Sequence, residues 1–264
     1  MRSLCGFVYT IVQMISLKDQ TIVITGGSRG IGRAAAILMA QAGADIVFDY
    51  YRNDAAAQEV VSAVEKTGRR AIAIRGNIAD DAHCKELIER AVSGFGKIDV
   101  LVNNAGIWTY APIDVMPEEV WRQTIEMNLS GLVYCTRYAV QQMKKQGRGR
   151  IINLSSTAGQ RGEAFHSHYA ATKGAIISLT KSWAAELAPD ILVNCVAPGW
   201  VDTDMSAGPL SNPEEYKQIV SLIPLRRVGT AEDMAGPILF LASELANFIN
   251  GEILNVNGGS VLAG

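Results

Sequence analysis

The strongest constraint on the fold is an alternation of short apolar runs with longer helical patterns along almost the whole chain. The runs are TIVITGG, ADIVFDY, RAIAIRGN, IDVLVNNAG, GRIINLSS, ILVNCVAPG and EILNVNGG. Their nearly continuous apolar character is typical of strands buried on both faces. Between them lie segments with helical spacing that end at glycine, such as GIGRAAAILMAQAG, NDAAAQEVVSAVEKTG and DAHCKELIERAVSGFG. The pattern predicts an α/β fold, a doubly wound parallel sheet of about seven strands with helices on both faces.

We expect a single domain over residues 14–264, because no linker or low-complexity tract interrupts this alternation. The segment at about 202–227 has no strand pattern and is longer than an ordinary connection, which predicts a lid over the substrate site. Residues 1–13 are interpreted as a dispensable N-terminal extension, and an upstream start codon is one hypothesis for its origin. This segment lacks a small-x-small cleavage pattern and is too short to span a bilayer.

A glycine-rich turn follows the first predicted strand. Gly26, Gly30 and Gly32 in TIVITGGSRGIG lie between that strand and the next helix. Glycine there permits a tight turn and lets backbone N–H groups approach a pyrophosphate at the helix N-terminus. In this strand-to-helix context the glycines favour dinucleotide binding over a purely structural turn.

A tyrosine and a lysine are four residues apart in HYAATKGA, where they are Tyr169 and Lys173. On a helix this spacing places both side chains on one face, so a phenol and an ammonium group can act on one point. The spacing alone is weak evidence, because many solvated helix faces carry the same pair.

Taken together, these motifs resemble those of the short-chain dehydrogenase/reductase family. The family pattern T-G-x-x-x-G-x-G matches Thr25 to Gly32, and the Y-x-x-x-K pattern matches Tyr169 and Lys173. The likeness continues through NNAG at Asn103 to Gly106, Asn128 in MNLSG, Ser156 in INLSS, and Pro198 with Gly199. It covers about Leu17 to the end, and the pattern is closest to the 3-oxoacyl-[acyl-carrier-protein] reductases. The resemblance implies a single-domain Rossmann fold and an NAD(P)-dependent enzyme that acts on a carbonyl or alcohol group.

The resemblance assigns catalytic roles to Asn128, Ser156, Tyr169 and Lys173. Tyr169 would protonate a carbonyl oxygen as hydride arrives, and Ser156, rather than the neighbouring Ser155, would polarise that carbonyl. A free tyrosine titrates at about 10, so its phenolate needs a nearby cation, which Lys173 would supply. Lys173 would also bind the nicotinamide ribose. Asn128 would hold a water that links Lys173 to solvent, or, alternatively, would only kink its helix by bonding to the backbone.

The resemblance also implies a set of residues that contact the cofactor. Besides Tyr169 and Lys173 they are Gly26, Ser28, Arg29, Gly30, Ile31, Gly32, Tyr50, Arg52, Asn77, Ile78, Asn104, Ala105, Gly106, Pro198, Gly199, Val201 and Thr203. Asn77 stands where the family usually has an aspartate near the adenine. The NNAG motif would also serve as a turn that stabilises the sheet.

The end of the second strand bears on the choice between NADP(H) and NAD(H). Family members that use NAD have an acidic residue there, which accepts the ribose hydroxyls and repels a 2′-phosphate. Alignment puts Tyr50 at that position, and strand alternation should turn Asp49 to the other face. Arg29 and Arg52 can bind a phosphate through bidentate contacts. We therefore expect NADP(H) to be preferred, with NAD(H) possible if the strand register differs by one residue.

The expected reaction is NADP-dependent reduction of a ketone to a secondary alcohol, with a 3-oxoacyl-[acyl-carrier-protein] as one substrate. The alternative is a sugar, polyol or hydroxysteroid-like alcohol dehydrogenase, and Trp108, Tyr110, Trp200 and Met205 are expected on the substrate side. Arg148 and Arg150 are candidates for docking an acidic carrier protein, whereas Asp190 offers the opposite charge. A nucleotide-sensing scaffold without chemistry is disfavoured, because all four catalytic candidates are present.

Charge and cysteine usage bound the remaining classes. A net charge of −2 gives no electrostatic reason to expect nucleic acid or an anionic membrane as a partner. Cys5, Cys84, Cys135 and Cys195 are far apart, which predicts reduced thiols in a cytoplasmic protein. His166 and His168 lack a third ligand in sequence, so no metal site is predicted. The family resemblance implies a homotetramer.

Overall fold

The computed structural model describes residues 15–263, so the predicted extension at residues 1–13 lies outside the described residues. The described chain forms a seven-stranded sheet in the order β3-β2-β1-β4-β5-β6-β7, with every neighbouring pair parallel. The strands are β1 (Thr21–Ile24), β2 (Asp45–Tyr50), β3 (Ala71–Arg75), β4 (Val100–Asn103), β5 (Gly149–Leu154), β6 (Ile191–Pro198) and β7 (Ile253–Val256). Each lies within one of the apolar runs, so the predicted doubly wound sheet is confirmed.

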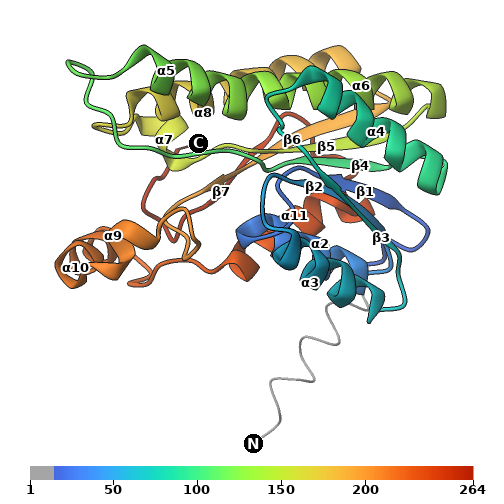
Figure 1. The fold of residues 1–264 in the computed structure, drawn as a ribbon, viewed down its shortest axis with the longest axis horizontal. Helices are drawn as coiled ribbons and strands as arrows, with labels where there is room; N and C mark the ends of the chain where they lie inside the picture. The colour runs from blue at the N-terminus through green and yellow to red at the C-terminus, as the bar shows by residue number, and fades with distance from the viewer. Residues whose placement is uncertain (1–14, 264) are drawn as a thin grey trace, which may run out of the picture.

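Helices cover both faces of the sheet (Figure 1). One face packs against α2 (Gly30–Gln41), α3 (Asp54–Glu65) and α11 (Ala231–Ala242), and the other against α4 (Asp81–Phe95), α6 (Gly131–Gln146) and α8 (Ser167–Leu187). The remaining elements are α5 (Glu118–Ile125), the π-helical turn η1 (Glu126–Ser130), α7 (Thr157–Arg161), α9 (Ala207–Ser211), α10 (Pro213–Ser221) and the 3₁₀ turn η2 (Glu244–Ala246). No helix within residues 15–263 has the length and apolar character needed to cross a bilayer.

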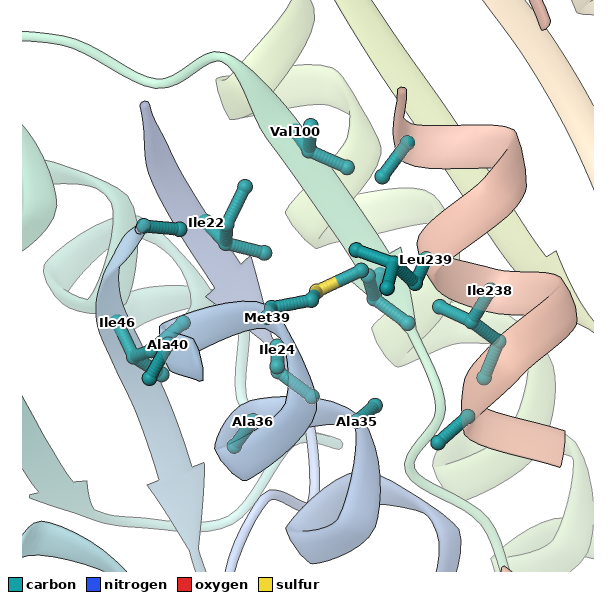
Figure 2. Packing of buried hydrophobic residues seen from close by; sticks show 14 of the residues in the cluster. Ile22, Ile24, Ala35, Ala36, Met39, Ala40, Ile46, Val100, Ile238 and Leu239 are labelled. Atoms are coloured by element: carbon teal, nitrogen blue, oxygen red, sulfur yellow. The ribbon is translucent and has the colours of Figure 1, made fainter. Parts of the chain in front are cut away.

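Alternate residues of the central strands enter two separate cores. Ile22 and Ile24 of β1 belong to the core beneath α2 and α11, whereas Val23 belongs to the core beneath α4, α6 and α8. In the first core, Met39 extends from α2 toward Leu239 of α11 (Figure 2). Because strand side chains alternate between the two faces, this pattern also determines which face of the sheet each polar side chain at a strand end points to.

The turn between β1 and α2 is packed closely against the end of β4. Gly26 has a φ of 68°, a conformation that favours glycine. The Asn104 side-chain amide donates to the carbonyl oxygens of Thr25 at 2.9 Å and Gly26 at 3.1 Å. The Thr25 hydroxyl in turn accepts the backbone N–H groups of Asn104 and Ala105, each at 3.0 Å. The glycine turn and the NNAG segment therefore form one bonded unit.

The segment at 202–227 is more ordered than its sequence indicates, because it contains α9 and α10. Asn212 ends one helix and caps the next, with its side chain accepting the N–H groups of Glu214 and Glu215. Backbone hydrogen bonds from Asp202 to Gly229 and from Gly229 to Trp200 join the two ends of this segment. In Figure 1, α9 and α10 lie together at one side of the molecule, away from the helices that cover the sheet.

Gly32→Ala should destabilise the protein, because a Cβ at this position would lie 2.3 Å from the Gly26 carbonyl oxygen. Overpacking against backbone typically costs about 1–3 kcal/mol. Urea denaturation measures the free energy of unfolding, and Arg33→Ala, at an exposed position of the same helix, is the control with little expected effect. A Gly32→Ala variant as stable as the wild type would contradict the packing described for the turn.

Candidate active site

A cavity of about 320 Å³ lies where the strands end at their carboxyl edge. Its walls come from the β1–α2 turn, the ends of β2, β4, β5 and β6, the first turns of α8, and residues 199–206. In parallel α/β sheets ligands bind at this edge. The cavity therefore lies where the glycine turn predicts a dinucleotide.

Most of the site residues expected from the sequence border this cavity. They are Gly26, Ser28, Arg29, Gly30, Ile31, Tyr50, Ile78, Asn104, Ala105, Gly106, Ser156, Tyr169, Lys173, Pro198, Gly199, Val201 and Thr203. Gly32, Arg52, Asn77 and Asn128 do not line it. Arg52 lies over the Tyr51 ring, with 4.5 Å from its guanidinium carbon to the ring centroid, and the Asn77 side chain accepts the Ala79 N–H. Their assignment as cofactor contacts stays a prediction.

The glycine turn provides the features that a pyrophosphate needs. Arg29 is the residue before α2, no side chain caps that helix, and no acidic residue lies in its first turn. The positive end of the helix dipole therefore faces the cavity, with no acidic side chain in the first turn of the helix itself. Gly30 lies directly against Thr203, because an added Cβ would lie 3.3 Å from the Thr203 methyl carbon. These residues fit a dinucleotide cofactor.

The end of β2 has the strand register that the alignment requires. Asp49 pairs with Ile74, and Tyr50 pairs with Arg75. Asp49 is buried on the α4 side, where its carboxylate accepts the Gly26 N–H at 2.6 Å and contacts His83 Nε2 at 3.2 Å. Tyr50 lies on the opposite side near Phe48, with 6.5 Å between the ring centroids. The expectation that Asp49 turns to the other face is confirmed.

The cationic side of the cofactor cavity is open to solvent. The Arg29 side chain is 71% exposed and lies 3.4 Å from the Asp204 carboxylate, which is equally exposed. An exposed ion pair of this kind is weak, so the guanidinium can exchange Asp204 for a phosphate at little cost. Tyr51, which the sequence reasoning did not include, also lines the cavity beside Tyr50.

The three reactive candidates meet at the other end of the cavity. Tyr169 and Lys173 lie on α8, and Ser156 caps α7. Burial raises the pKa of Tyr169 to about 12, a rise that the Ser156 hydroxyl opposes by hydrogen bonding and that the charge of Glu163 increases. Burial also lowers the pKa of Lys173 to about 8. The adjacent Ser155 donates to the Lys173 carbonyl oxygen at 2.7 Å, which leaves Ser156 as the hydroxyl facing the phenol.

The expectation that Lys173 stabilises the Tyr169 phenolate stays a prediction. Lys173 Nζ donates to the Leu154 carbonyl oxygen at 2.8 Å and lies 5.6 Å from the centroid of the Tyr169 ring. Desolvation dominates both pKa values and favours the uncharged form of each group. The phenol is therefore protonated near neutral pH, which is the form that can donate a proton.

Asn128 lies behind the cavity, within the π-helical turn η1 between α5 and α6. Its side chain accepts the Ile107 N–H at 2.7 Å and donates to the Ile107 carbonyl oxygen at 2.9 Å. An added Cβ on Gly106 would lie 3.2 Å from Asn128 Oδ1 and 3.7 Å from Lys173 Nζ. The contacts are those of the alternative in which Asn128 bonds to the backbone. Its role in holding a water molecule stays a prediction.

Two tryptophans and a carboxylate border the substrate end of the cavity. The Trp108 indole stacks on His166 at 4.3 Å and meets Trp200 edge-on at 5.8 Å. Burial raises the pKa of Glu163, and His166, the Trp108 indole N–H and Arg161 partly offset this rise. Trp108, Trp200 and Met205 line the cavity as expected, but Tyr110 does not.

Sequence reasoning missed Glu163 and Arg161, which both line the cavity. They carry no motif of their own, and the available signal was their position in the short connection between Ser156 and Tyr169. Because Ser156 and Tyr169 are expected at one site, the short connection between them, which carries Arg161 and Glu163, must lie near that site.

Comparison with known proteins places this arrangement in a family. The family model described as enoyl-(acyl carrier protein) reductase matches residues 26–260. An L-rhamnose 1-dehydrogenase (NAD(P)(+)) of Sphingomonas sp. (strain SKA58) is 40% identical over 92% of this chain and 96% of its own length. A 3-oxoacyl-[acyl-carrier-protein] reductase of Staphylococcus aureus (strain Mu50) is 42% identical over 91% and 97%. The structure of a short-chain dehydrogenase/reductase from Brucella melitensis, described as a glucose/ribitol dehydrogenase, superposes with a TM-score of 0.85 at 33% identity, covering 94% and 99%.

The chain belongs to the short-chain dehydrogenase/reductase family. It is an NAD(P)-dependent oxidoreductase that acts on a CH–OH or C=O group, as the sequence motifs imply. The relatives divide between sugar and acyl-carrier substrates at nearly equal identity, so membership in the family leaves the substrate class open.

Tyr169 of this short-chain dehydrogenase/reductase should remain protonated at a pH where a free tyrosine is half ionised. The cause is burial, which raises its pKa to about 12. The Tyr169 ¹³Cζ resonance is identified as the one that is missing in Tyr169→Phe. We expect its chemical shift to stay constant up to a pH of about 10, the ordinary pKa of tyrosine. Tyrosine-labelled, cofactor-free protein is used for this NMR titration. A midpoint below the ordinary value would mean that Lys173 outweighs burial.

Proposed function

We propose that this protein is an NADP(H)-dependent oxidoreductase that reduces a ketone to a secondary alcohol. The observation that supports NADP(H) is the inward position of Asp49, whose carboxylate bonds to Gly26 and His83 rather than facing the adenosine ribose. Tyr50 and Tyr51 border the cavity there, and Arg29 lies on its rim. A 2′-phosphate would thus meet an arginine whose carboxylate partner is the exposed Asp204, while the Asp49 carboxylate is held by Gly26 and His83.

The side chains supply binding, orientation and a proton. When bound, the nicotinamide supplies or accepts the hydride. Ser156 and Tyr169 lie where they can both donate hydrogen bonds to a carbonyl oxygen, which polarises the carbonyl group. Tyr169 gives its proton to that oxygen, and Lys173, with a pKa of about 8, can pass a proton toward the resulting phenolate near neutral pH.

Arg29→Ala should reduce the affinity for NADPH by at least about tenfold, which corresponds to about 1.4 kcal/mol. Affinity for NADH should hardly change, because NADH has no 2′-phosphate. Fluorescence titration of both cofactors measures the two dissociation constants. Arg33→Ala is the matched control, since Arg33 is exposed, lies one turn further along α2 and does not line the cavity. Equal losses for NADPH and NADH in Arg29→Ala would refute the phosphate contact.

The first substrate that we propose is a 3-oxoacyl thioester, in keeping with the names of several relatives. The expected docking residues give this candidate little support. Arg148 pairs with Asp99 at 3.5 Å, and Arg150 bonds to the Asn247 side chain. Arg148 comes just before β5 and Arg150 is near its start, so both lie at the edge of the sheet opposite the cavity. A carrier protein bound by these arginines would therefore not reach the active-site entrance.

A small polyhydroxylated substrate, such as a sugar or polyol, is the second candidate, and the cavity favours it. The Glu163 carboxylate can accept hydrogen bonds from hydroxyl groups, and the neighbouring indoles of Trp108 and Trp200 offer apolar faces to a ring. An acyl chain has no hydroxyl group near this position, so it would give the Glu163 carboxylate no hydrogen bond beyond those of its protein neighbours.

Glu163→Leu should lower kcat/KM for aldose or polyol oxidation by at least about tenfold, the scale of a lost hydrogen bond to a charged group. Activity on a 3-oxoacyl thioester should be retained. Steady-state assays with both substrate classes test this, and Glu59→Leu, at an exposed position on α3, is the control. Tyr169→Phe should abolish both activities. Retained polyol oxidation with loss of thioester reduction in Glu163→Leu would instead favour the 3-oxoacyl thioester as the substrate.

We also propose that residues 14–264 form one domain, that 202–227 acts as a substrate lid, and that the protein is a cytoplasmic homotetramer. The backbone pairing at Gly229 and the position of Met205 at the cavity support the lid. The exposed Leu245, Phe248 and Leu262 near the edge strand β7 support association. The buried free thiols of Cys84, Cys135 and Cys195 are consistent with a reducing compartment.

A further inference from the structure

A buried carboxylate and imidazole lie directly behind the glycine turn. Asp49 and His83 expose only 2% and 7% of their surfaces, and Asp49 Oδ2 lies 3.2 Å from His83 Nε2. The other oxygen, Oδ1, accepts the Gly26 N–H at 2.6 Å. The Asp49 carbonyl oxygen also accepts the Gly27 N–H at 3.0 Å. Asp49 is therefore bonded to two successive residues of the turn that would carry the cofactor pyrophosphate.

A glycine makes room for the imidazole. A Cβ on Gly76 would lie 2.0 Å from His83 Nδ1, so any other residue at this position would displace the ring. The Gly76 N–H donates to the Tyr50 carbonyl oxygen at 2.9 Å, which holds the loop after β3 against the end of β2. Both Gly76 and Asp49 border the cofactor cavity, whereas His83 lies behind them on α4.

The position of the carboxylate matters because Asp49 can face either of two environments. Held by His83 and Gly26, it is buried behind the turn. Without the imidazole, one oxygen would be buried without a partner, which is costly for a charge. A rotation of the side chain toward the adjacent cavity would relieve that cost. There the carboxylate would accept ribose hydroxyls and repel a 2′-phosphate.

We propose that His83 is a positioning residue that sets the cofactor preference by holding the Asp49 carboxylate against the Gly26 N–H. This inference rests on the proposed preference for NADP(H) and adds the residue that maintains it. His83 acts through Asp49 and does not itself contact the cofactor.

Two amides provide a matched test of this role. In His83→Gln the side-chain nitrogen can take the place of Nε2 and donate to Asp49. In His83→Asn the shorter side chain places its nitrogen near the Nδ1 position, where it cannot reach the carboxylate. We expect the ratio of NADH to NADPH dissociation constants to stay near the wild-type value in His83→Gln and to fall by at least about tenfold in His83→Asn. Fluorescence titration measures both constants.

The double variant His83→Asn/Asp49→Asn separates positioning from a structural role. Without the charge at position 49, the ratio should return to the wild-type value. Parallel loss of affinity for both cofactors in His83→Asn, with an unchanged ratio, would overturn the inference. So would a ratio that stays low in the double variant. A wild-type protein that binds NADH as tightly as NADPH would refute the proposed preference alone, because the inference is tested by the change between the Gln and Asn variants.

Gly76→Ala gives a second route if His83→Asn does not fold. Its methyl group would displace the imidazole while every charged group remains in the chain. The ratio should fall in Gly76→Ala and recover in Gly76→Ala/Asp49→Asn. An unchanged ratio in folded Gly76→Ala would overturn the inference.

Discussion

The site depends on the close approach of two backbone segments, the β1–α2 turn and the end of β4. Asn104 and Thr25 bond these segments to each other, and the absence of a side chain at Gly32 lets α2 start directly behind Gly26. Every other part of the cavity is positioned relative to this unit. The parallel sheet then brings the ends of β5 and β6, which lead into Ser156 and the Pro198–Gly199 turn, to the same edge.

Burial is the main electrostatic influence at both ends of the cavity. Around the catalytic candidates it raises the pKa of Tyr169 and lowers that of Lys173, so burial shifts both groups toward their uncharged forms. At the adenosine end a buried carboxylate is kept inside the protein by two partners. The cost of burying charge is thus met differently at the two places: by shifted pKa values at Tyr169 and Lys173, and by hydrogen-bond partners at Asp49.

Sequence reasoning predicted all seven strands and most of the residues that border the cavity, because periodicity and glycine spacing are local signals. It also predicted the direction of Asp49 from strand alternation. It could not find His83, which is on α4, 34 residues from Asp49 in sequence, and has no motif. Glu163 was missed for the same reason. The spacing predicts that Tyr169 and Lys173 share a helix face, but the burial that raises the pKa of Tyr169 depends on the packed fold and has no local sequence signal. The two helices at 202–227 were hidden by their proline and glycine content.

The most direct test of this account is a crystal structure of the protein with NADP⁺ bound. The account predicts that the Arg29 guanidinium leaves Asp204 and binds the 2′-phosphate, while the Asp49 carboxylate still accepts the Gly26 N–H and contacts His83. An Asp49 side chain turned into the cavity, with its carboxylate on the adenosine ribose and Arg29 away from the phosphate, would contradict it.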